Sequence, residues 1–121
     1  MNVEYPNWHD YHCRNRAISK KVKQLLTEDE KNALISYLSE NPNTGDLIQG
    51  TSGVRKLRWA RSSMGKSGGT RIIYYYHNEM MPLYLLTLFG KNEKSNLSMG
   101  EKQILSKAVK ELVSYWRQRN G

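Results

Sequence analysis

Six lysine and arginine side chains lie in one stretch of the sequence that contains no acidic residue. The stretch runs between Asp46 and Glu79, and its cations are Arg55, Lys56, Arg58, Arg61, Lys66 and Arg71. They account for most of the formal net charge of +8. Cations held together bind a phosphate backbone by releasing its counterions. The stretch therefore predicts a phosphate-binding surface, and the alternative is a set of ordinary solvated charges.

The same residue types suit the cleavage of RNA. RNA supplies its own nucleophile, the ribose 2′-hydroxyl, so a protein needs only to position the phosphate, stabilise its developing charge and move a proton. Positive charges that are held together favour the neutral form of a neighbouring lysine, which can then act as a base. A ribonuclease without a metal ion or a catalytic histidine is chemically reasonable.

Other candidate groups are less promising. His9, His12 and His77 have a spacing that fits no metal-binding pattern. Cys13 is the only cysteine, so it can form no intramolecular disulfide and is too few for a cysteine-based zinc site; the simplest interpretation is a free thiol in a reducing cytosol. We expect neither a metal ion nor a cofactor.

Three consecutive tyrosines, Tyr74, Tyr75 and Tyr76, could stack on RNA bases. Side chains alternate between the two faces of a strand, so at least one of the three is expected in the core. A structural role for all three is the alternative. Most carboxylates are placed to cap helices, which argues against a hydrolase with paired carboxylates.

Several elements are expected to position these groups. Apolar spacing predicts an amphipathic helix over Arg14 to Leu26. Thr27-Glu28-Asp29-Glu30 is a capping box that opens a second helix, which carries Ala33, Leu34, Tyr37 and Leu38 on one side and ends near Asn41-Pro42.

Three strands are expected after a turn-rich segment over residues 43–53. They cover Val54 to Ala60, Arg71 to Tyr76 and Leu83 to Phe89, and their short connections favour antiparallel neighbours. Alternation in the first strand places Lys56 and Arg58 on one face. Leu57 and Trp59 point to the other face, and if these two meet the helices, the cations lie on the open face.

Ser98-Met99-Gly100-Glu101 is a second capping box. It opens a C-terminal helix whose apolar face is predicted to contain Ile104, Leu105, Ala108, Val109, Leu112 and Trp116. The architecture expected is α+β, with helices packed on one side of a small, mostly antiparallel sheet. Residues 1–121 are expected to form a single domain, with no signal peptide and no membrane-spanning segment.

Four segments in order resemble the RelE/HigB superfamily of toxins, in particular its HigB-like branch. They are GTSGVRKLR, GKSGGTRIIYYY, LYLLTLFGKNEKSNLS and the helix that follows, and the similarity covers Asn41 to Trp116. The resemblance implies a compact α+β domain with two N-terminal helices and a C-terminal helix on a curved, mostly antiparallel sheet.

The resemblance also implies a function. The protein would be the toxin of a type II toxin–antitoxin system, a metal-independent endoribonuclease that cleaves mRNA in the ribosomal A site and stops translation. A cognate antitoxin with a helix-turn-helix DNA-binding domain would neutralise it, and the toxin would meet operator DNA only through that antitoxin. It would act in the cytoplasm, without contact to a membrane.

Carried over position by position, the resemblance implies a catalytic set and an RNA-binding set. The catalytic set is Lys56, Arg58, Arg71 and Lys91, and the RNA-binding set is Arg55, Arg61, Lys66 and Lys94. The best-studied RelE relatives have an arginine and a tyrosine where this sequence has Asn92 and Ser98. Either Lys91 or Lys56 is therefore the candidate for proton transfer.

Two other functions are compatible with the sequence. The same fold family includes ParE-like proteins that inhibit gyrase, and a toxin of this kind could bind gyrase or the ribosome without cleaving RNA. A basic module that binds ribosomes or nucleic acid without toxicity is the third possibility.

Overall fold

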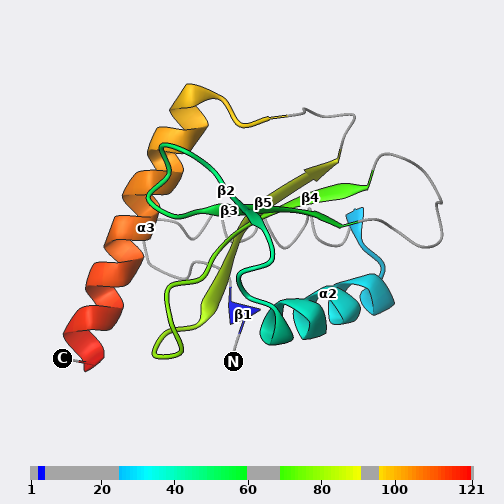
Figure 1. Ribbon diagram of the computed structural model, residues 1–121, viewed down its shortest axis with the longest axis horizontal. Helices are drawn as coiled ribbons and strands as arrows, with labels where there is room; N and C mark the ends of the chain where they lie inside the picture. The colour runs from blue at the N-terminus through cyan, green and yellow to red at the C-terminus, as the bar shows by residue number, and fades with distance from the viewer. Residues whose placement is uncertain (1–2, 5–24, 60–68, 91–95, 121) are drawn as a thin grey trace.

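A central sheet and two helices make up the described part of the protein (Figure 1). The computed structural model describes residues 3–4, 25–59, 69–90 and 96–120. Along the chain, the elements are β1 (Val3–Glu4), α2 (Glu28–Glu40), β2 (Asp46–Leu47), β3 (Arg55–Trp59), β4 (Thr70–Tyr75), β5 (Leu83–Gly90) and α3 (Met99–Asn120).

The sheet has the strand order β1-β5-β4-β3-β2. Its four strands from β2 to β5 are antiparallel to their neighbours, and β1 joins β5 in parallel. The three predicted strands are confirmed, with ends that shift by at most one residue. The two-residue strand β2 was not predicted, because its segment was expected to form turns.

Both capping boxes are confirmed. Thr27 N donates to Glu30 Oε1 at 2.8 Å, and Glu30 N donates to Thr27 Oγ1 at 3.1 Å, which closes the first turn of α2. Ser98 and Glu101 make the same reciprocal pair, at 2.8 and 3.1 Å, at the start of α3. The helix predicted over Arg14 to Leu26 lies outside the described residues except for its last two positions.

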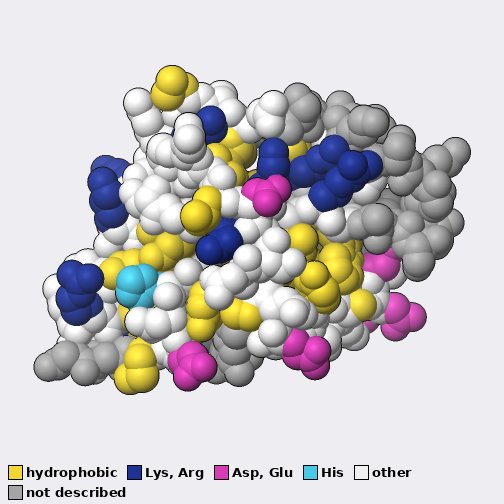
Figure 2. All heavy atoms as spheres, viewed as in Figure 1, with side chains coloured by type: hydrophobic (Ala, Val, Ile, Leu, Met, Phe, Trp, Pro, Cys, Tyr) yellow, Lys and Arg dark blue, Asp and Glu magenta, His cyan; other side chains and the backbone are white. Residues whose placement is uncertain are grey.

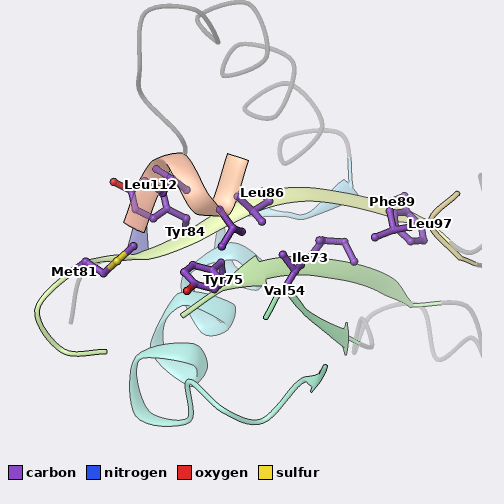
Figure 3. Packing of buried hydrophobic residues seen from close by; sticks show 10 residues of the cluster. Val54, Ile73, Tyr75, Met81, Tyr84, Leu86, Phe89, Leu97 and Leu112 are labelled. Carbon is purple, nitrogen blue, oxygen red and sulfur yellow. The ribbon is translucent and has the colours of Figure 1, made fainter. Parts of the chain in front are cut away.

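The helices were expected to pack on one side of the sheet. They pack on both sides instead. One core joins Leu34 and Leu38 of α2 to one face of the sheet. A second core joins Val109 and Leu112 of α3 to the opposite face, and Figure 3 shows Leu112 next to Tyr84 of β5 in this core. The physical reason is that β4 and β5 bury side chains on both faces, so each face needs its own cover.

Three positions that were predicted on apolar helix faces are exposed. They are Ala33 and Tyr37 of α2 and Ile104 of α3, and 37% of Tyr37 and 49% of Ile104 is accessible to solvent. The other apolar residues predicted for α3 are buried or partly buried. Neither of the described helices is long and apolar enough to cross a membrane.

Candidate functional site

Three of the predicted site residues lie together on one face of the sheet. Arg58 of β3 is directly opposite Arg71 of β4 in the antiparallel register, and Lys56 is two residues from Arg58 on the same strand. Opposite residues of an antiparallel pair have Cβ atoms about 5 Å apart, and alternate residues of one strand share a face. We call the set of Lys56, Arg58 and Arg71 the cationic corner.

The cationic corner lies on the face that also carries α3. Phe89 is opposite Arg71 on β5 and belongs to the core beneath α3, as does Ile73, which is opposite Lys56. We expected this face to be open to solvent. It is instead shared between a helix and a group of cations. Figure 2 shows lysine and arginine side chains gathered over the part of the sheet where β3 ends and β4 begins.

Arg58 and Arg71 are like charges directly opposite each other on neighbouring strands. The interaction between the two charges is by itself unfavourable, because like charges repel. Such a conflict between local energetics and fold is expected at a functional site. A guanidinium group has N–H donors in a planar fork that suits phosphate oxygens, so each of these two arginines is a suitable phosphate ligand.

Lys56 is held from the segment that leads into α3. Its Nζ donates to Asn96 Oδ1 at 3.3 Å. The next residue, Leu97, is buried beside Phe89 in the second core, which fixes this segment against the sheet (Figure 3). Asn96 was not predicted as a site residue, and no local sequence pattern marks it, because its contact joins residues 40 positions apart.

The face of β3 opposite the cationic corner packs against the core beneath α2. Leu57 and Trp59 pack against the core that contains Leu34 and Leu38, as predicted from alternation. Lys56 and Arg58 are thereby directed away from α2. The structure confirms this division of β3 into an apolar and a cationic face.

Arg55 is on the other side of β3 from the cationic corner. Its Nη1 donates to the carbonyl oxygens of Asn43 at 3.1 Å and Gly45 at 2.7 Å, so its guanidinium holds the loop between α2 and β2. The structure does not bring Arg55 together with Lys56, Arg58 and Arg71. Its observed contacts are structural.

The remaining four predicted cations lie outside the described residues, as does Asn92. They are Arg61, Lys66, Lys91 and Lys94. Lys91 directly follows Gly90, whose partner on β4 is Thr70, next to Arg71. The role of Lys91 therefore stays a prediction.

The tyrosines of β4 serve the fold. Tyr74 is fully buried; its Oη donates to the Pro42 carbonyl at 2.9 Å and accepts from Gly45 N at 2.8 Å. Tyr75 is 6% exposed and its Oη contacts His77 Nδ1 at 3.0 Å. Burial raises the pKa of both hydroxyls, because a phenolate would be poorly solvated there. Neither ring is accessible to an RNA base.

Tyr76 packs partly against the core under α2. Of the three histidines considered as metal ligands, His77 is exposed. His9 and His12 lie outside the described residues, as does Cys13. Within residues 25–59, 69–90 and 96–119, no group of three histidine, cysteine or acidic residues is placed to hold a metal ion.

The fold and this site define a small α+β protein with three cationic side chains on one face of its sheet. A family model described as the RelE toxin of the RelE/RelB toxin–antitoxin system matches residues 13–119. Because the match covers most of the chain, the protein belongs to the RelE toxin family, and the predicted superfamily is confirmed. Membership implies a cognate antitoxin as a protein partner.

Proposed function

We propose that this toxin is a ribosome-dependent endoribonuclease that cleaves mRNA in the A site and so stops translation in the cytoplasm. The observation that carries the proposal is the register of β3 and β4, which sets Arg58 opposite Arg71 with Lys56 on the same face. Three cations within reach of one phosphodiester can bind it and stabilise its transition state.

The proposed reaction is an internal transfer at phosphorus. The ribose 2′-oxygen attacks the adjacent phosphorus atom while the bond from phosphorus to the 5′-oxygen breaks, which leaves a 2′,3′-cyclic phosphate and a 5′-hydroxyl. One proton leaves the 2′-hydroxyl and one is delivered to the departing 5′-oxygen, so the protons balance. No oxidant or reductant is needed.

The roles of the side chains follow from their positions. The guanidinium groups of Arg58 and Arg71 donate to the non-bridging phosphate oxygens, where negative charge increases during attack. Lys56, held by Asn96 at the rim of the same surface, is a candidate for moving one of the two protons. Lys91 is the other candidate, from its place directly after β5.

The partner chemistry belongs to the same proposal. The cognate antitoxin is expected to carry a helix-turn-helix domain that binds operator DNA, with the toxin reaching that DNA only through the antitoxin. A net charge of +8 favours acidic partners, including the phosphate-rich ribosome.

The test is primer extension on mRNA from cells in which the toxin has been induced. We expect cuts within codons for the natural protein and a loss of about 100- to 1000-fold in cleavage for Arg71→Ala, the usual effect of removing one donor that stabilises a developing anion. Lys110→Ala is the matched control, because it removes one exposed positive charge from α3, outside the cationic corner.

Three results would contradict the proposal. Full cleavage by a folded Arg71→Ala protein would remove the arginine pair from the mechanism. Intact mRNA accompanied by DNA damage would identify a gyrase inhibitor of the ParE kind instead. Harmless expression without the antitoxin would indicate a binding module without toxicity.

A further inference from the structure

Two aromatic rings form an exposed pair where α2 meets the end of β3. The ring centroids of Tyr37 and Trp59 are 5.5 Å apart, with an angle of 43° between the ring planes. Tyr37 is 37% exposed, and its Oη contacts Thr44 Oγ1 at 3.0 Å, which fixes the ring. Trp59 is partly buried against the core beneath α2. We call Tyr37 and Trp59 the aromatic pair.

The aromatic pair and the cationic corner are separated only by the edge of the sheet. Trp59 follows Arg58 directly on β3, and the two side chains leave the strand on opposite faces. The edge strand β2 pairs only with Arg55 and Lys56. At Arg58 and Trp59, β3 is therefore the outermost strand of the described sheet, so the cationic and the aromatic side chains lie on the two faces of that one edge.

The surface around the aromatic pair fits a ligand with a charged end and a flat apolar end. Figure 2 shows hydrophobic side chains gathered between α2 and the end of β3, on the same side of the molecule as the lysine and arginine group. One acidic side chain lies beside the cations, and the others in this view lie beyond the hydrophobic area. Asp46 is opposite Lys56 in the register, whereas Arg58 and Arg71 are opposite each other. An anion is thus attracted to Arg58 and Arg71, whereas an uncharged ring can lie on the hydrophobic area.

We propose that the aromatic pair is a stacking site for an RNA base, next to a phosphate bound at the cationic corner. The inference rests on the proposed function and adds to it a site for the base. Phosphates are held by Lys56, Arg58 and Arg71, while the strand crosses the edge of β3 and one base stacks on Tyr37 or Trp59. Stacking on an aromatic ring tolerates any base, because every base has a π face.

The test separates the base from the phosphate. The probe is a fluorescein-labelled single-stranded oligoribonucleotide, compared with the same chain in which the nucleotides are abasic, at low ionic strength. We expect the natural protein to bind the intact RNA about 5- to 100-fold more tightly than the abasic RNA, the range typical of aromatic stacking. Tyr37→Ala should reduce this ratio and leave the affinity for abasic RNA unchanged.

Further variants test whether one ring replaces the other and whether each protein is folded. Tyr37→Ala combined with Trp59→Leu removes both rings while keeping apolar volume at the partly buried position, and it should abolish the preference for intact RNA. Tyr37→Phe retains the ring and should bind like the natural protein. Tyr115→Ala is the matched control, because it removes another exposed tyrosine, 51% accessible, from α3. Thermal unfolding establishes that each variant is folded.

The outcomes distinguish this inference from the proposed function. A folded double variant that retains the full preference for intact RNA would overturn the stacking site alone. Arg71→Ala binding both RNAs as tightly as the natural protein would overturn the phosphate site and the proposed cleavage with it. Binding of neither RNA by the natural protein would overturn both.

Discussion

Replacing Tyr74 by phenylalanine should destabilise the protein by about 2 kcal/mol. The buried hydroxyl joins β4 to the loop before β2 through two hydrogen bonds, to the Pro42 carbonyl at 2.9 Å and from Gly45 N at 2.8 Å. Phenylalanine keeps the ring in the core and removes only these bonds. The change therefore isolates the contribution of the hydroxyl.

The magnitude depends on which partners are left without a bond. Gly45 is buried, so its N–H loses its partner without access to water, which costs about 1–3 kcal/mol. Pro42 is only partly buried, so its carbonyl can be hydrated at a smaller cost. For a chain of 121 residues, about 2 kcal/mol corresponds to a fall of about 8 °C in Tm.

Urea unfolding followed by circular dichroism measures this change, with the m-value as a check that the compactness of the two states is unaltered. Tyr115→Phe is the control, because that ring is 51% exposed and its contact with the Arg119 guanidinium needs only the ring. If Tyr74→Phe lost no more than about 0.5 kcal/mol, as expected for the exposed control, the two hydrogen bonds would not stabilise the loop.

Three further predictions concern stability. Burial raises the pKa of Tyr74 and Tyr75, so the unfolded chain releases these protons first as pH rises past about 10, and the stability that the neutral hydroxyls contribute is complete below that pH and lost above it. Urea unfolding between pH 8 and 11 should therefore become easier at the alkaline end, and Tyr75→Phe should reduce the dependence of the free energy of unfolding on pH. Gly45→Ala should cost about 1–3 kcal/mol in the same assay, because a Cβ there would lie 2.9 Å from the Tyr74 hydroxyl and 3.0 Å from the Lys56 carbonyl oxygen; an unchanged midpoint would mean that the loop moves freely. Thr27→Ala should cost about 1 kcal/mol through loss of the α2 cap, whereas Thr27→Ser should restore it.

Local patterns in the sequence were reliable where the interaction itself is local. Each capping box joins residues three positions apart, so Thr27 with Glu30 and Ser98 with Glu101 could be paired before any fold was known. The division of β3 into a cationic and an apolar face was equally predictable, because alternation is a property of a single strand.

Predictions that depend on distant contacts were less successful. The placement of α2 and α3 on opposite faces depends on β4 and β5, which are buried on both sides. Their near-continuous apolar runs are the signal that could have indicated two covered faces. Tyr37 was assigned to the apolar side of its helix, although only Leu34 and Leu38 of α2 are buried in the core.

The sequence by itself determined that the protein has a strongly cationic segment, where its two described helices begin, and that Lys56 and Arg58 share one side of β3. The register that sets Arg58 opposite Arg71, the separation of Arg55 from them, and the closeness of Tyr37 to Trp59 were decided only by the tertiary structure. The physical reason is that register is set by the packing of whole strands, and a slip of one residue would turn every side chain to the other face.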